Sequence, residues 1–182
     1  MISDLVERAQ RGDHEAFDAL AAAAYHRLYA IARRILRDGY AAEDAVQETL
    51  VGAWRNIRSL RDPERFDAWI HRLLIRACGD EVRRSRRRPV AIPPMFDRPA
   101  PTDDFATLVD HDEIERAFLA LSVEHRAVLV LTHYVGLPAS DVAAILGIPP
   151  GTVHSRLHYG ARAMREVLTV ASAPFASPEH GR

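Results

Sequence analysis

The sequence predicts an all-α protein of two small helical domains joined by a flexible, proline-rich linker. Apolar residues recur at helical spacing along nearly the whole chain, and no segment shows the two-residue alternation of a strand. Five of the 11 prolines lie between residues 89 and 104, where few core-forming residues occur. A length of 182 residues is enough for two small domains. We therefore expect domains at 1–88 and 108–171, a linker at 89–107 and a tail at 172–182.

Two helices are expected at the start of the first domain. Asp13 can cap a helix whose apolar face runs from Phe17 to Ile35, and Gly39 lies just beyond its expected end. A second helix, with apolar residues again on one side, is expected over about 41–57.

A third helix follows a break in the pattern. Pro63 disfavours helix at the residue before it, so residues 58–63 should form a connection. The apolar spacing resumes at Phe66 and runs into a cluster of arginines at 83–88. A charge run is usually a solvated surface, but its place at the end of this helix makes a nucleic-acid contact the preferred interpretation.

The second domain carries a helix-turn-helix pattern. A short helix at 140–146 holds the small Ala143 where another helix must cross closely. Gly147 permits a left-handed turn, and Ile148 can fill the space between the two helices. An ordinary helical hairpin is the alternative. The outward face of the following helix favours DNA binding, because hydroxyl and guanidinium groups suit phosphates and base edges. These outward residues are Thr152, Ser155, Arg156, Tyr159 and Arg162.

The charge is divided into two blocks. The formal net charge of −1 excludes a generally basic nucleic-acid coat. Residues 54–88 nevertheless contain eleven arginines and five acids, a net charge of +6, whereas residues 97–115 have a net charge of −6. The basic block points to an anionic partner. The acidic block can mimic nucleic acid or can simply keep the linker soluble.

Several other functions are disfavoured. A single cysteine, Cys78, cannot form an internal disulfide, and no apolar run reaches about 18 residues, so we expect a cytoplasmic protein with no membrane contact. His154 and His158 are four residues apart, but no third ligand lies nearby, and no catalytic motif accompanies the other histidines and acids. We expect no enzyme activity, no cofactor and no metal.

Four motifs in order resemble a known family. They are Asp44-Ala45-Val46-Gln47-Glu48 with Ala53-Trp54-Arg55, Phe66-x-x-Trp69-Ile70 with Asp80-x-x-Arg83-Arg84, Leu121-x-x-x-x-Arg126-x-Val128-Leu129, and Gly151-Thr152-Val153-His154-Ser155-Arg156-Leu157. The chain up to about Val170 resembles a bacterial sigma factor of the extracytoplasmic-function class, with sigma regions 2 and 4 in its two domains. This resemblance implies a transcription initiation factor that directs core RNA polymerase to promoters.

The resemblance also implies partners and site residues. Core polymerase would be bound through a coiled coil and the flap, and an anti-sigma factor is a further possible partner. An acidic surface would suit a basic coiled coil. The residues expected to face polymerase are Asp44, Gln47 and Glu48.

Promoter DNA would be read at two places. A loop at 56–66 would take up an extruded base of the −10 element, and the helix after it would contact the backbone. The −10 candidates are Asn56, Ser59, Arg61, Asp62, Phe66, Arg76, Arg83, Arg84 and Arg87. The −35 candidates on the helix-turn-helix are Thr152, His154, Ser155, Arg156, Tyr159 and Arg162.

Four positions depart from the expected pattern. His154 stands where the family usually has lysine or arginine, Ser122 where proline is usual, and Arg76 where many members have asparagine. Gly160 lies within a helix, where glycine costs up to about 1 kcal/mol relative to alanine.

The main alternative is a free-standing helix-turn-helix regulator that binds an operator as a dimer. It accounts for the second domain but leaves the 44–55 motif and the basic block without a role. The sigma-factor interpretation also predicts weak promoter binding by the free chain, because polymerase must hold both weak DNA modules at the correct separation.

Overall fold

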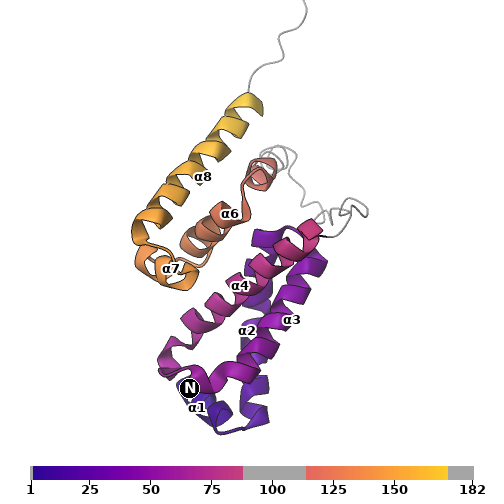
Figure 1. Cartoon of the computed structure of the whole chain (residues 1–182), viewed down its shortest axis with the longest axis vertical. Coiled ribbons are helices and arrows are strands. Elements are labelled where there is room, and N and C mark those ends of the chain that lie inside the picture. The colour runs from indigo at the N-terminus through magenta and orange to yellow at the C-terminus, as the bar shows by residue number, and fades with distance from the viewer. Residues whose placement is uncertain (1, 88–113, 172–182) are drawn as a thin grey trace, which may run out of the picture.

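The structure is a computed structural model that describes residues 2–87 and 114–171, and every regular element in these ranges is a helix or helical turn. Figure 1 shows two helical units, one from each end of the chain. The first contains α1 (Ile2–Gln10), α2 (His14–Leu36), α3 (Gly39–Asn56), the 3-10 turns η1 (Ile57–Ser59) and η2 (Pro63–Arg65), and α4 (Phe66–Arg87). The second contains a helical stretch at 114–119, α6 (Val123–Leu129), the π-helical turn η3 (Val130–Tyr134), α7 (Ala139–Leu146) and α8 (Pro150–Ala171). The expected linker at 89–107 and the expected tail at 172–182 lie outside the described residues.

The expected helices are present, with one boundary placed differently. Asp13 caps α2, and its carboxylate accepts a hydrogen bond of 3.1 Å from the backbone N–H of Ala16. The residue that ends α2 in a left-handed conformation is Arg37, with φ 63°, and not Gly39. Gly39 is the first residue of α3, because the side chain of Asp38 caps the next helix immediately.

The sequence analysis did not predict α1. This helix buries Val6 and Ala9 against the rest of the first unit. The guanidinium of Arg8 forms an ion pair of 2.8 Å with Asp13. The backbone N–H of Ala16 and the side chain of Arg8 together lower the pKa of the Asp13 carboxyl. The α2 cap therefore also fixes the end of α1.

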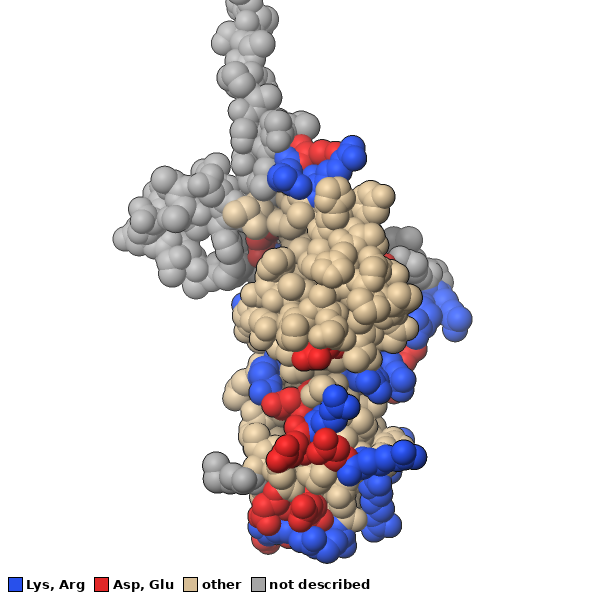
Figure 2. Space-filling model, turned by 90° about the vertical axis from the view of Figure 1, so that its left-hand side faces the viewer, with Lys and Arg blue, Asp and Glu red and all other residues tan. Residues whose placement is uncertain are grey.

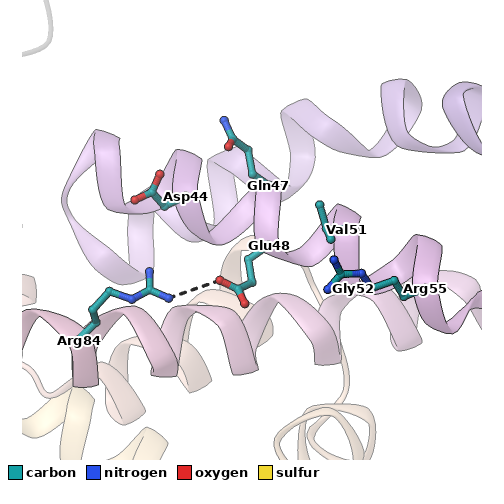
Figure 3. Close-up of a pocket in the computed structure, with 7 residues that line it drawn as sticks. All are labelled: Asp44, Gln47, Glu48, Val51, Gly52, Arg55 and Arg84. Atoms are coloured by element: carbon teal, nitrogen blue, oxygen red, sulfur yellow. Dashed lines mark hydrogen bonds and ion pairs between the residues drawn. The ribbon is translucent and has the colours of Figure 1, made fainter.

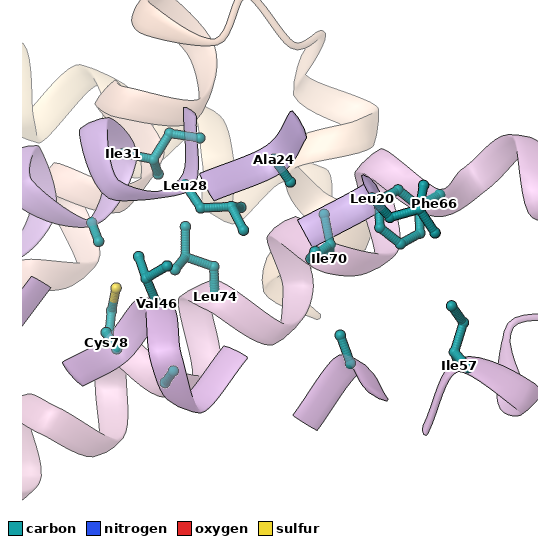
Figure 4. Close-up of a cluster of buried hydrophobic side chains, with 14 of the residues drawn as sticks. Leu20, Ala24, Leu28, Ile31, Val46, Ile57, Phe66, Ile70, Leu74 and Cys78 are labelled. Carbon is teal, nitrogen blue, oxygen red and sulfur yellow. The ribbon is translucent and has the colours of Figure 1, made fainter. Parts of the chain in front are cut away.

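The core of the first unit lies between α2, α3 and α4. Leu28, Val46 and Leu74 are fully buried at its centre (Figure 4). Trp54 and Trp69 are partly buried and pack against this core, as expected. Cys78 is buried, and its burial raises the pKa of the thiol to about 12, so it is a packed side chain and not a nucleophile.

The helix-turn-helix has a smaller core of its own. Val142, Ala143 and Val153 are buried there, and Ile148 packs against them from the turn. Gly147 ends α7 with φ 66°, which confirms the expected left-handed turn. Ser122 caps α6 and thereby provides the helix start that proline usually occupies.

Gly160 is explained by a close approach between α8 and α6. A Cβ atom at this position would lie 3.2 Å from Cδ1 of Leu129 and 3.7 Å from Cβ of His125. A side chain at this position would require Leu129 to shift, so the glycine suits the close packing of the two helices.

The two units pack against each other. Arg72 of α4 donates a hydrogen bond of 3.0 Å to the carbonyl oxygen of Ala144 in α7. Arg34 lies 3.7 Å above the ring of Tyr134, and Arg37 is ion-paired with Glu115. No helix in the described ranges is long and apolar enough to cross a membrane.

Candidate functional site

The first candidate surface is the outward face of α3. Asp44, Gln47 and Glu48 are exposed on this face, opposite the buried Ala45 and Val46. Helical spacing places the three polar side chains together because residues three and four positions apart are neighbours. Together with Val51, Gly52, Arg55 and Arg84 they line a pocket of about 380 Å³. Figure 3 shows how these seven residues lie on α3 and α4.

Arg84 joins this surface to α4. Its guanidinium lies 2.5 Å from the carboxylate of Glu81, which is 9% exposed, and 3.5 Å from the carboxylate of Glu48 (Figure 3). A nearly buried carboxylate needs a close counter-charge, so Glu81 holds Arg84 in place. Arg84 is also a predicted DNA contact, and in the structure its guanidinium is paired with two carboxylates; its part in DNA binding stays a prediction.

The second candidate surface is the connection between α3 and α4. Ile57 and Leu60 are buried, whereas Ser59, Arg61 and Asp62 are exposed. The connection therefore presents polar side chains to the outside, while its apolar side chains are buried against the core.

Three predicted loop residues have structural contacts. Asp62 accepts a hydrogen bond of 3.0 Å from the backbone N–H of Glu64 and so shapes the turn. Asn56 donates one of 2.8 Å to the carbonyl oxygen of Gly52. Phe66 is 3% exposed, which corrects its prediction as a DNA contact, because its ring lies in the core beneath the loop.

Gln10 is a residue that the sequence analysis missed. Its side-chain amide donates hydrogen bonds of 3.0 Å and 2.6 Å to the carbonyl oxygens of Ile57 and Leu60. Arg58 returns a hydrogen bond of 3.2 Å to the carbonyl oxygen of Gln10. These partners are about fifty residues apart in sequence, and no local pattern connects them.

The outward arginines of α4 follow the helix away from the loop, and several of them lie near the second unit. Arg76 is exposed and lines a pocket of about 340 Å³ between α4 and the end of α7, together with Arg72 and Arg83. Arg83 forms an ion pair of 2.5 Å with Asp80. Arg87 is exposed at the end of the helix. With Arg84, four of the predicted −10 arginines thus lie on one helix.

The third candidate surface is α8. His154, Ser155 and Tyr159 are exposed, and the hydroxyl of Ser155 donates a hydrogen bond of 3.0 Å to the carbonyl oxygen of Thr152. Arg162 is exposed but is paired with Glu166 at 2.7 Å. The two remaining candidates are half-buried: Thr152 and Arg156.

One face of the second unit carries few charged side chains. Figure 2 shows a broad uncharged area over the helix-turn-helix, with acidic and basic side chains crowded on the unit below it. On α8 itself the exposed candidates are His154, Ser155, Tyr159 and Arg162, and Arg162 is paired with Glu166.

One buried histidine lies apart from these surfaces. His71 of α4 is 4% exposed, and neither of its ring nitrogens has a hydrogen-bond partner among the described residues. Burial lowers its pKa, and the nearby charge of Arg27 lowers it further. Within residues 2–87 and 114–171, no three His, Cys, Asp or Glu side chains are grouped to hold a metal ion.

Known families match both units. Residues 20–88 match the model of Sigma-70 region 2, and residues 111–164 match the model of Sigma-70, region 4. The ECF RNA polymerase sigma factor SigM of Mycobacterium tuberculosis is 33% identical over 154 residues, which cover 85% of this chain and 78% of SigM. The RNA polymerase sigma-H factor of Pseudomonas aeruginosa is 32% identical over 178 residues, which cover 90% of this chain and 92% of that protein.

Solved structures agree with the sequence relatives. The structure of CnrH in complex with the cytosolic domain of CnrY superimposes with a TM-score of 0.68 and 25% identity, and covers 94% of this chain and 99% of that one. The sigma factor RpoE in complex with the anti-sigma factor NepR from Bartonella quintana gives a TM-score of 0.61 and 25% identity, and covers 85% of this chain and 97% of that one. On the family models and the sequence identities, the chain belongs to the extracytoplasmic-function family of RNA polymerase sigma factors.

Proposed function

We propose that this chain is a transcription initiation factor that binds core RNA polymerase and directs it to promoters by reading their −10 and −35 elements. It has no catalytic activity of its own and acts in the cytoplasm, where polymerase and genome meet. The observation that carries this proposal is the presence of three separate polar surfaces, on α3, on the α3–α4 connection with α4, and on α8.

Each surface is assigned one role. Asp44, Gln47 and Glu48 contact a basic coiled coil of polymerase, because their exposed face of α3 carries two carboxylates. The exposed Ser59 and Arg61 contact bases of the −10 element, and the α4 arginines contact its backbone. The exposed face of α8 enters the groove of the −35 element.

An anti-sigma factor is a second partner in this proposal. One structure similar to this chain holds the sigma factor RpoE in complex with the anti-sigma factor NepR, and another holds CnrH in complex with the cytosolic domain of CnrY. We infer that an anti-sigma factor can bind this chain too.

Run-off transcription with core polymerase on fragments of the source genome tests the proposal. The wild-type chain should produce discrete new transcripts. Asp44→Arg with Glu48→Arg should abolish them because both reversals repel a basic surface. Asp18→Arg is the control, since Asp18 is an exposed acid on α2, away from this face.

Two results would contradict the proposal. If the wild-type chain binds DNA as a dimer but neither co-purifies with core polymerase nor supports new transcripts, the operator-binding regulator is correct. If Asp18→Arg abolishes transcription as completely as the double reversal, the α3 face is not the polymerase contact.

A further inference from the structure

The end of α1 is joined directly to the connection that carries the exposed −10 candidates. The amide of Gln10 bridges the carbonyl oxygens of Ile57 and Leu60, and Arg58 donates back to the carbonyl oxygen of Gln10. Gly12, with φ 96°, lies beside the guanidinium of Arg58, so the turn after α1 follows the same surface. Three hydrogen bonds thus connect two segments that are distant in sequence.

The connection needs such support because it has little regular structure of its own. Its backbone hydrogen bonds close two short turns. The N–H of Leu60 donates to the carbonyl oxygen of Ile57, and the N–H of Arg65 donates to the carbonyl oxygen of Asp62. Buried side chains at Ile57 and Leu60 fix the connection from below. Gln10 fixes the carbonyl groups of these two residues, and so sets the backbone on which Ser59 and Arg61 stand.

The helix that supplies Gln10 is firmly placed. Val6 is fully buried and Ala9 is 2% exposed. The ion pair of Arg8 with Asp13 ties the end of α1 to the capped start of α2. A rigid donor costs less to immobilise than a free side chain, so these bonds can hold the connection in one conformation.

We propose that Gln10 is a positioning residue for −10 recognition: it holds the connection between α3 and α4 in the conformation that presents Ser59, Arg61 and Asp62 to the bases. This inference rests on the proposed function. Residues 1–19 precede the segment that matches Sigma-70 region 2, so Gln10 and its hydrogen bonds to the connection come from a part of the chain outside that segment. Misplacing a recognition group by a fraction of an ångström weakens discrimination between bases more than it weakens backbone contacts.

The test uses polymerase holoenzyme formed with the full chain, and a pool of promoter fragments randomised at both the −10 and −35 positions. Sequencing the transcripts gives the preference for each base at each position. Gln10→Glu is nearly isosteric but replaces the donating amide by an acceptor that faces two carbonyl oxygens. Gln10→Met keeps the length and removes the donors. Arg11→Met is the matched control on the exposed side of the same turn.

We expect Gln10→Met to reduce discrimination at one or more −10 positions by about 3- to 10-fold, which corresponds to losing one or two hydrogen bonds. Gln10→Glu should reduce it further, and Arg11→Met should leave it unchanged. Discrimination at the −35 positions should be unchanged in all variants, because α8 does not touch this connection. Thermal unfolding of each variant should confirm that α1 remains folded.

Three outcomes have distinct meanings. Unchanged −10 discrimination in both Gln10 variants would overturn the positioning role. An equal loss at the −10 and −35 positions would also overturn it, because the effect would then be general loss of folded protein. If the wild-type chain yields no promoter-dependent transcripts at all, the proposed function itself is wrong.

Discussion

Arg72 donates a hydrogen bond to the carbonyl oxygen of Ala144, and this bond joins α4 to the helix-turn-helix. The groove between α4 and α7 is lined by Arg76 and Arg83 on one side and by the turn at Gly147 on the other. Promoter elements one and a half to two helical turns apart lie roughly 50–70 Å from each other. Because the two units are in direct contact here, we predict that they separate when both elements are read at once.

We expect the packed arrangement to open when its side-chain contacts are removed. Tyr134→Ala removes the ring under Arg34, and Glu115→Gln removes the partner of Arg37. Each contact is worth about 0.5–1 kcal/mol, so the double variant should raise the population of separated units by roughly 5- to 30-fold. Fluorescence energy transfer between dyes on the two units measures this change. Tyr159→Ala is the control: it removes an exposed tyrosine outside this contact and should leave the transfer efficiency unchanged. If the double variant has the transfer efficiency of the wild-type chain, these contacts do not hold the units together.

Glu48 and Arg84 link the exposed acidic face of α3 to α4, and we expect this pair to restrain Arg84 in the free chain. Glu48→Gln should release one side of the guanidinium and raise the affinity for a single-stranded DNA oligonucleotide by about 2- to 5-fold in low salt. Asp44→Asn removes the same charge from the same face, but Asp44 forms no ion pair with a described residue, so its effect should be smaller. Fluorescence anisotropy measures both affinities.

A double-variant background makes the Glu48 prediction specific. The double variant Arg84→Gln with Glu81→Gln removes the Glu48 partner and also neutralises Glu81, so the nearly buried carboxylate of Glu81 is not left unpaired. Glu48→Gln should then change DNA affinity no more than Asp44→Asn does. A persistent excess effect in that background would show that overall charge, and not the ion pair, controls DNA affinity.

Two helical glycines should respond oppositely to substitution. At Gly52 of α3 nothing lies within 4 Å of an added Cβ, so Gly52→Ala should raise the free energy of unfolding by about 0.5–1 kcal/mol. At Gly160 a side chain meets Leu129, so Gly160→Val should lower it by roughly 1–3 kcal/mol. Urea unfolding measures both values. Similar changes at the two positions would mean that helix propensity alone governs them.

The sequence predicted the helices whose apolar stripes are long and capped, and it missed what depends on contacts between distant segments. Asp13 and Gly147 gave correct local signals because a cap and a left-handed turn are set by neighbouring residues. Arg37 took the left-handed position expected near Gly39, since the Asp38 cap starts the next helix at once. The nine-residue α1 is short, and its place is set by burial against the other helices.

The candidate surfaces divide in the same way. Exposure of Asp44, Gln47 and Glu48 follows from helical periodicity alone. The burial of Phe66 and the contacts of Gln10 do not, because they depend on how the connection folds back over the core. The role of each surface in binding remains a prediction that the experiments above test.

Stability should fall in mildly acidic solution because of His71. Burial, aided by the charge of Arg27, lowers the pKa of His71 below its usual 6.5, while Asp67 opposes this shift. As the pH falls, His71 is therefore protonated at a higher pH in the unfolded chain than in the folded chain. As pH falls below about 6.5, unfolding takes up protons and the free energy of unfolding decreases, until the pH reaches the pKa of the folded state.

Urea unfolding at pH 7.5 and pH 5.5 checks the sign of this dependence. His71→Leu should show a smaller loss of stability between the two pH values than the wild-type chain. His154→Asn, which changes an exposed histidine, should retain the wild-type loss. If His71→Leu keeps the full pH dependence, other titrating groups are responsible.

His154→Arg should strengthen binding to the −35 element. His154 is exposed on α8, at a position where the family usually has lysine or arginine. A permanent positive charge there can neutralise one more phosphate, which steepens the dependence of log affinity on log salt by about 0.9. Holoenzyme binding to a promoter fragment, measured over a range of salt concentrations, tests this. His133→Arg adds the same charge at an exposed position on η3, off the recognition helix, and should leave the slope unchanged. If both variants steepen the slope equally, the gain reflects general attraction to DNA and α8 is not the contact.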